Sequence, residues 1–141
     1  MTRPEFILDA RLQADTAPVI SLDMCDVLLM NDARFPWLIV VPRETGLVEI
    51  SDLGEHAQQR LWHEVNRAAT VLRQAALCDK LNVGALGNIV RQLHIHVVAR
   101  REGDAAWPGP VWGHGRAEPY VDDKLQLQLV LLRRAFDATP K

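Results

Sequence analysis

The chain has 141 residues, a formal net charge of -2 and a hydrophobic content of 48%. These values indicate one globular domain, residues 1–141, that is large enough to bury a core. They give no reason to expect general nucleic-acid binding, because no long run of Lys or Arg is present. Cys25 and Cys78 are too few for a disulfide framework or a zinc cluster, so free thiols in a reducing compartment are expected. With no apolar signal core and no segment that could span a membrane, a cytoplasmic protein is expected.

The first part of the chain predicts several short strands. Residues 6–8 and 18–20 are short apolar runs that fit a strand or the start of one, and residues 27–30 and 37–41 predict stronger strands. Residues 31–36 between the stronger pair have turn-forming composition. Residues 27–41 should therefore form an antiparallel hairpin.

A long helix is expected after the hairpin. Ser51 or Asp52 can cap its N-terminus, and Glu55 lies three residues after Asp52, as in a capping box. Six apolar residues recur at helical spacing and form one apolar face: Leu53, Ala57, Leu61, Val65, Ala68 and Leu72.

The second part of the chain predicts two more strands, a loop and a helix. Residues 79–85 fit a strand that runs into a glycine-bearing turn, and the next strand should begin near Ile89. Residues from about 103 to 119 are rich in Trp, Pro and Gly, which excludes regular helix or strand. Residues from 120 to about 136 predict a final helix, although their alternating leucines also fit a strand. The order of elements favours an α+β fold with a mainly antiparallel sheet.

The segment from Gln92 to Val98 alternates polar and apolar residues. On a β-strand, Gln92, His94 and His96 share one face, and the apolar residues between them face the core. Two imidazoles on one rigid strand indicate a chemical site, because imidazole suits nucleophilic, acid–base and metal-binding work near neutral pH. A purely structural role is disfavoured, since three polar groups in a core would all need hydrogen-bond partners.

The same segment resembles the signature of the histidine triad (HIT) superfamily, His-φ-His-φ-His-φ-φ with φ apolar, and it carries Gln92 in place of the first His. Four upstream residues resemble the family's Asn-x-Gly…Gly-(Gln/Asn) approach to the triad: Asn82, Gly84, Gly87 and Asn88. Residues 28–43 resemble the hairpin that forms the family's nucleoside pocket. The resemblance spans roughly residues 25–100 and implies a HIT-like fold with one long helix and a C-terminal helix.

The resemblance implies a nucleotide hydrolase or nucleotidyl transferase. It would act at the α-phosphate of a nucleoside phosphoramidate, a dinucleoside polyphosphate or a related nucleotide. His94 would be the nucleophile that forms a covalent nucleotidyl-histidine, and His96 would stabilise charge on the phosphate. Gln92 would be the remaining catalytic residue, in the place of the first His of the triad, but an amide cannot act as an acid or base at neutral pH. His114 in the flexible loop is a candidate substitute.

The resemblance also implies a set of substrate-binding residues: Asp32, Asn82, Gly87, Asn88 and Ile89. Asp32 would accept hydrogen bonds from the ribose, and Asn82 and Asn88 would position the phosphate or the leaving group. Backbone N–H groups near Gly87, Asn88 and Ile89 would approach the phosphate. Ile89 stands where some relatives carry Ser, so its side chain cannot bond a phosphate oxygen. Apolar neighbours of the base would be Met30, Leu28 and Phe6.

Two alternatives remain for the paired histidines. In the first alternative, the chain is a nucleotide-binding module with weak catalysis, which Gln92 and Ile89 favour. In the second, His94 and His96 bind a metal ion. The metal site lacks a third or fourth ligand at local spacing. No cofactor and no metal are expected.

The expected partners are a nucleotide, with a purine base by family resemblance, and a second copy of the chain. Relatives often form two-fold homodimers whose sheets join, and such dimers are common in general. Trp107 and Trp112 would then contribute to the interface or to the pocket rim, or both rings would simply cover their own sheet. No membrane partner is expected.

Overall fold

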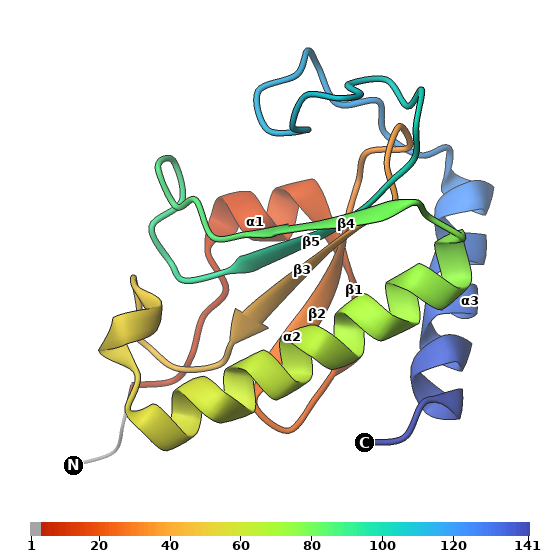
Figure 1. Cartoon of the computed structure of the whole chain (residues 1–141). Helices are drawn as coiled ribbons and strands as arrows, with labels where there is room; N and C mark the ends of the chain where they lie inside the picture. Colours follow the sequence, from red (N-terminus) through yellow and green to blue (C-terminus); the bar gives the residue numbers. More distant parts are fainter. Residues whose placement is uncertain (1–3) are drawn as a thin grey trace.

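A computed structural model describes residues 4–141 of the chain. Within that range the elements follow in this order: α1 (Ala10–Asp15), β1 (Thr16–Ser21), β2 (Cys25–Met30), β3 (Trp37–Pro42), the 3-10 helix η1 (Ile50–Asp52), α2 (Glu55–Ala76), β4 (Lys80–Gly84), β5 (Ile95–Arg100) and α3 (Asp122–Ala138). Figure 1 shows α2 running diagonally across the sheet, with α3 at one side of it. None of the helices in the described range is both long and apolar enough to cross a bilayer.

The five strands form one sheet in the order β1-β2-β3-β5-β4, and every neighbouring pair is antiparallel. The predicted α+β class with a mainly antiparallel sheet is therefore confirmed. The predicted hairpin is also present, because β2 and β3 pair directly with Val27 opposite Val40. β5 lies between β3 and β4, so the strand that carries His96 is held on both sides.

The two faces of the sheet are covered differently. The larger core packs α2 and α3 against one face and includes Leu93, Ile95 and Val97, as the alternation predicted. A smaller cluster covers the other face and joins α1, β3 and the loop after β5 through Leu12, Trp37 and Val111. His96 alternates with Ile95 and Val97, so it lies on this second face, away from α2.

Both predicted helices are present, and their buried residues fit the predicted spacing. On α2 the buried set includes Leu61, Val65, Ala68 and Leu72. On α3 Leu129, Leu132 and Phe136 are buried, while Leu127 and Leu131 are 55% and 45% exposed. The alternating leucines of α3 therefore follow a helical period.

The predicted start of the long helix is wrong. The helix begins after Gly54, which provides no side-chain cap, and Asp52 lies in the preceding η1 turn. The Asp52 carboxylate accepts hydrogen bonds from the backbone N–H groups of Val48 and Glu49, at 3.0 and 2.8 Å. Asp52 does take part in a capping box, but with Glu49 and around the shorter helix.

The N-terminal segment also differs from the prediction. Residues 6–8 form no strand and are followed by α1, which the sequence reading did not predict. The Asp9 side chain accepts a hydrogen bond from the backbone N–H of Arg11 at 2.8 Å, so Asp9 caps α1. An N-cap aspartate before a run of helix-forming residues was the local signal for this helix.

Both cysteines are free thiols, as expected. Cys25 is buried beside the carboxylate of Glu64, which accepts a hydrogen bond from the Cys25 backbone N–H at 2.8 Å. Burial, and then the charge of Glu64, raise the pKa of the Cys25 thiol. Cys25 is therefore an unreactive core residue.

Candidate active site

His94 and His96 lie together at the start of β5. Their ring centroids are 4.9 Å apart, and the rings meet edge to face at 69°. Each residue is only 6% exposed, so both imidazoles are largely removed from water. The predicted strand start near Ile89 is wrong, because β5 begins at Ile95. His94 therefore stands at the end of a loop, and His96 stands on the strand itself.

The orientation of the His94 ring follows from one hydrogen bond. Its Nδ1 lies 2.7 Å from the backbone carbonyl oxygen of Gln92. A carbonyl oxygen can only accept, so Nδ1 carries the proton and donates. The neutral ring then has its lone pair on Nε2. That nitrogen is the one available for attack on an electrophile.

His96 is held between two indole rings. Trp37 Nε1 donates a hydrogen bond to His96 Nδ1 at 3.0 Å, and Trp112 packs edge to face on the ring with centroids 5.5 Å apart. Burial, followed by the neighbouring His94, lowers the pKa of His96 to about 3. His96 is therefore neutral at physiological pH.

A cavity of about 460 Å³ opens onto both histidines, and we call it the histidine cavity. One wall is the loop between β4 and β5, including Gly87, Asn88 and Ile89. Gly87 has a φ of 73°, a backbone conformation that favours glycine. Among residues 4–141, the backbone N–H groups of these three residues donate to no other protein group. The opposite wall comes from α1 and includes Arg11 and Asp15.

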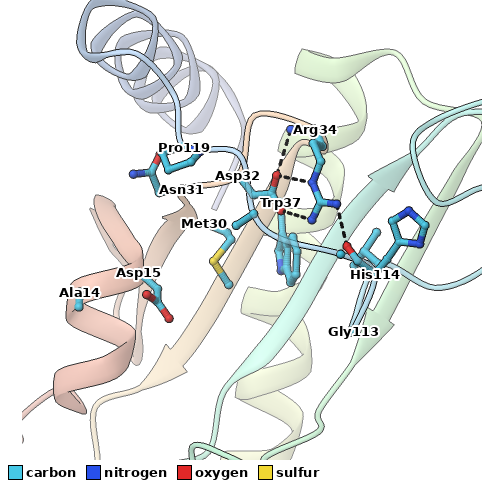
Figure 2. A pocket seen from close by; sticks show the side chains of 13 residues that line it. Ala14, Asp15, Met30, Asn31, Asp32, Arg34, Trp37, Gly113, His114 and Pro119 are labelled. Carbon is cyan, nitrogen blue, oxygen red and sulfur yellow. Dashed lines mark hydrogen bonds and ion pairs between the residues drawn. The ribbon is translucent and has the colours of Figure 1, made fainter.

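A second cavity, of about 360 Å³, lies at the end of the β2–β3 hairpin, and we call it the hairpin cavity. It is lined by Asn31, Asp32 and Arg34, and it shares four lining residues with the histidine cavity: Asp15, Met30, Trp37 and Gly113. Figure 2 shows the Asp32–Arg34 pair on one side of this cavity and Asp15 of α1 on the other. The two cavities therefore adjoin and form one extended site.

Comparisons with known proteins show the family to which the chain belongs. The family model described as the HIT domain matches residues 11–103, about two thirds of the chain. The chain belongs to the HIT family. A histidine triad protein from Sinorhizobium meliloti is 47% identical, with 92% of this chain and 96% of that chain covered and a TM-score of 0.90. A histidine triad protein from Bradyrhizobium japonicum is 44% identical, with 94% and 99% covered and a TM-score of 0.91.

A third HIT structure, from Marinobacter aquaeolei, is 43% identical, with 94% of this chain and 97% of that chain covered and a TM-score of 0.91. No curated protein sequence matches the chain. HIT proteins are in general nucleotide hydrolases or transferases, so membership of the family indicates nucleotide-related activity of this kind. The particular substrate does not follow from membership.

The sequence predicts that Gln92 shares a face with His94 and His96, but its side chain lies elsewhere. Its side chain does not line the histidine cavity. Instead its Oε1 accepts from the backbone N–H of Asp9, and its Nε2 donates to the backbone carbonyl of Ile7, both at 2.9 Å. The amide thus holds the segment that leads into α1. A histidine ring could not make this paired contact, because its two nitrogens point in different directions.

Asp32 lines the hairpin cavity, but its carboxylate is already engaged. The residue is 1% exposed, and its oxygens accept from Arg34 Nε and Nη2, at 3.0 and 2.9 Å, and from the backbone N–H of Glu118 at 3.3 Å. Burial alone would raise the pKa of Asp32, but the hydrogen bonds from Arg34 and Glu118 lower it on balance. The predicted contact of Asp32 with ribose hydroxyls stays a prediction.

Asn82 is also occupied. Its Oδ1 accepts a hydrogen bond from Nη1 of the buried Arg100 at 2.8 Å, and the residue lines neither cavity. His114 lines the hairpin cavity rather than the histidine cavity. Its backbone carbonyl accepts from Arg34 at 2.7 Å (Figure 2). The geometry does not bring His114 to the position of a substitute acid.

The two loop tryptophans have different settings. Trp112 forms part of the wall of the histidine cavity, and the side chain packs near Gly84, where an added Cβ would meet it at 3.4 Å. Trp107 lies over the guanidinium of Arg100, with 5.6 Å between that group and the ring centroid. Within one chain, Trp112 therefore belongs to the site and Trp107 covers a buried cation.

Several site residues were missed by the sequence reading. Arg11 and Asp15 were missed because α1 was not predicted, and Trp37 was assigned only to a strand. The position of Trp37 in an alternating strand gives its face but not its partner. Met30 was predicted as a neighbour of the base, and it lines both cavities.

Proposed function

We propose that this protein hydrolyses nucleotides at the α-phosphate through a covalent nucleotidyl-histidine on His94. The observation that carries the proposal is the His94–Gln92 hydrogen bond, which leaves the Nε2 lone pair free in a cavity beside His96. The glycine-bearing loop opposite supplies backbone N–H groups for phosphate oxygens. The substrate class is a nucleoside phosphoramidate, a dinucleoside polyphosphate or a related nucleotide.

The proposed reaction has two displacement steps. In the first, Nε2 of His94 bonds to the α-phosphorus, and the bond from phosphorus to the leaving group breaks. The leaving group keeps the electron pair and takes a proton from water. In the second, water bonds to phosphorus and gives up a proton to solvent, and the phosphorus–nitrogen bond breaks, which releases the nucleoside monophosphate and restores His94. Backbone N–H groups at Gly87, Asn88 and Ile89 stabilise the charge on the phosphate in both steps.

The nucleoside would occupy the hairpin cavity. Met30 supplies an apolar surface for the base, for which a purine is proposed. Because Asp32 is held by Arg34, the Asp15 carboxylate is the better acceptor for ribose hydroxyls. Its side chain is 55% exposed and stands at the junction of the two cavities.

The test is release of AMP from adenosine 5′-phosphoramidate, followed by chromatography. Turnover by the wild-type protein supports the proposed hydrolase. The alternative is a nucleotide-binding module of the same fold with weak catalysis, which predicts binding of AMP in calorimetry without turnover of this substrate or of diadenosine polyphosphates. Absence of both binding and turnover contradicts both proposals.

We propose that Gln92 acts by positioning α1 and not by proton transfer. We expect Gln92→Ala to lower stability by about 1–2 kcal/mol, because two hydrogen bonds to the backbone are lost. The value of kcat should stay within about tenfold of wild type, since general acid–base groups typically contribute a hundredfold or more. The value of KM should rise, because α1 carries Arg11 and Asp15.

The measurements for this variant are urea unfolding and steady-state kinetics. Gln126→Ala provides the control, because Gln126 is an exposed residue on α3. A loss of kcat by a hundredfold or more with unchanged stability would show that Gln92 takes part in the chemistry.

We also propose that the protein is a homodimer that pairs through β4. This strand is at one edge of the sheet, where backbone groups are free to pair with another chain. Val83 on β4 is 44% exposed and Leu77 just before it is 82% exposed. Sedimentation at micromolar concentration should give a dimer, and Val83→Asp should give a monomer. Leu127→Asp, at an exposed position of α3, should remain dimeric, and a monomeric wild type would contradict the proposal.

A cytoplasmic location is proposed on the state of the thiols. Cys78 is only partly buried and both cysteines are unpaired, which a reducing compartment preserves. Fractionation of cells that produce the protein would test the location, and recovery outside the cytoplasm would contradict it.

A further inference from the structure

Trp37 and His96 meet across two neighbouring strands. In the register of β3 and β5, Trp37 lies opposite Val98 and Ile39 lies opposite His96, so both rings project from the same face of the sheet. The indole Nε1 lies 3.0 Å from the imidazole Nδ1. Trp37 is 7% exposed and His96 is 6% exposed, so water has little access to this contact.

The direction of this hydrogen bond is fixed by chemistry. An indole N–H can only donate, so His96 Nδ1 must offer a lone pair. A neutral imidazole with its lone pair on Nδ1 carries its proton on Nε2. A protonated imidazole would place a second N–H against the indole N–H, and the bond would be lost. The observed contact is therefore compatible with only one protonation state of His96.

The surroundings of His96 favour the same state. His94 is the titratable group in direct contact with it, and Arg11 and Asp15 of α1 are the charged residues that line the same cavity. The other contacts are the Trp37 and Trp112 rings, which carry no charge. The combined effect of burial and of His94 holds the pKa of His96 near 3, far below the usual range of imidazole.

We propose that Trp37 is a positioning residue that holds His96 as the neutral Nε2–H tautomer, so that His96 gives one hydrogen bond to the phosphate bound at His94. The phosphate part of this inference rests on the proposed function, whereas the tautomer does not. His94 and His96 then have opposite tautomers, because His94 carries its proton on Nδ1 and His96 on Nε2. The His94 ring presents a lone pair that can attack phosphorus. The His96 ring presents an N–H that can donate a hydrogen bond to the charged phosphate.

His94 and His96 have separate roles in this arrangement. A neutral His96 donates a hydrogen bond throughout the reaction and neither takes nor releases a proton. The acid limb of the pH profile of kcat then reports groups other than His96. Removing the indole N–H while keeping an aromatic ring should let the neutral His96 ring exchange between its two tautomers, and this change is measurable without substrate.

The experiment is long-range proton–nitrogen NMR of protein with ¹⁵N-labelled histidine, from pH 4 to pH 9. His96→Gln identifies the His96 signals, and no substrate is needed. In the wild-type protein we expect His96 to show a bare Nδ1 and a protonated Nε2 at every pH in this range. In Trp37→Phe we expect a mixture of the two neutral tautomers, because the indole N–H no longer selects one of them. Trp62→Phe is the matched control, because Trp62 is 41% exposed on α2, and it should leave the His96 signals unchanged.

A protonated Nδ1 on His96, or a titration of His96 in the wild-type protein between pH 4 and pH 9, would overturn the proposal. Unchanged His96 signals in a folded Trp37→Phe would do the same. If Trp37→Phe does not fold, the wild-type spectrum alone still decides the tautomer.

The kinetic part uses adenosine 5′-phosphoramidate. Trp37→Phe should lower kcat by about ten- to a hundredfold, the loss that is typical when a metal-bound histidine loses the hydrogen bond that orients it. KM should change much less, because the tautomer of His96 matters most for the charge that develops during the reaction. Trp62→Phe should match the wild type. A wild-type protein without turnover would contradict the proposed function and leave the tautomer assignment standing on the NMR result.

Discussion

Replacing His94 with Ala should lower kcat for release of AMP from adenosine 5′-phosphoramidate by at least about a thousandfold. The reason is that no other side chain with a free imidazole lone pair lines the histidine cavity in the described part of the chain. His96 lines it, but its Nδ1 is bonded to Trp37 and its Nε2 then carries the proton. The affinity for AMP should stay within about tenfold of wild type, because hairpin-cavity and backbone contacts remain.

Two further measurements test whether the loss of turnover is specific to His94 and whether His94 carries the covalent intermediate. His56→Ala changes an exposed histidine at the start of α2 and should leave turnover unchanged. Mass spectrometry of protein quenched at alkaline pH, where phosphorus–nitrogen bonds survive, should find one nucleotidyl group on the wild-type chain and none on His94→Ala. Turnover by His94→Ala at a tenth of the wild-type rate or more would exclude His94 as the nucleophile.

Replacing Asp104 with Ala should destabilise the fold by about 3–5 kcal/mol, because it leaves a buried guanidinium without its carboxylate. Arg100 and Asp104 have side-chain exposures of 2% and 9%, and two hydrogen bonds join them, at 2.8 and 2.9 Å. The Arg100 guanidinium also lies over the rings of Phe35 and Trp107. Urea unfolding at pH 7 measures the loss of stability.

The double variant Arg100→Leu with Asp104→Ala should lose less stability than the sum of the two single variants, because it leaves no unpaired charge. Additive losses would show that the pair is not coupled. Arg11→Ala is the control, since Arg11 pairs with Asp15 only at 3.9 Å and is 63% exposed in its side chain. Such an exposed pair contributes at most about 1 kcal/mol.

The same pair predicts a pH dependence. The hydrogen bond from Arg100 lowers the pKa of Asp104 to about 2 in the folded protein, whereas an unfolded Asp has a pKa of about 3.9. A carboxyl whose folded pKa is lowered stabilises the fold above its unfolded pKa and loses this contribution as pH falls toward its folded pKa. The stability difference between wild type and Asp104→Ala should therefore shrink between about pH 4 and pH 2. A difference that is constant across this window would contradict the assignment.

Local patterns in the sequence predicted the elements whose burial repeats regularly. Leu61, Val65, Ala68 and Leu72 recur at helical spacing, and α2 buries all four. The hairpin of β2 and β3 follows from two apolar runs around a turn. Such predictions succeed because burial on one face requires a fixed period, and the period is visible in neighbouring residues.

One prediction failed where several backbone N–H groups compete for the same carboxylate. Asp52 was assigned to the cap of α2, but its carboxylate bonds to the N–H groups of Val48 and Glu49. The Asp32 carboxylate is engaged by a guanidinium two residues away and by the N–H of Glu118, and its predicted contact with a ribose stays a prediction. Composition and period describe burial well, but they do not rank the partners that compete for one carboxylate.

By itself the sequence determined the α+β class, the antiparallel hairpin, the long helix and the pairing of His94 with His96 within a HIT signature. Only the tertiary structure decided what Gln92 and Trp37 do. Gln92 bonds to backbone groups 83 and 85 residues away, and Trp37 donates to a ring 59 residues away. These contacts depend on how separate segments pack, and no local period encodes such a pairing. The physical reason is that a short hydrogen bond needs correct distance and direction, which only the folded chain supplies.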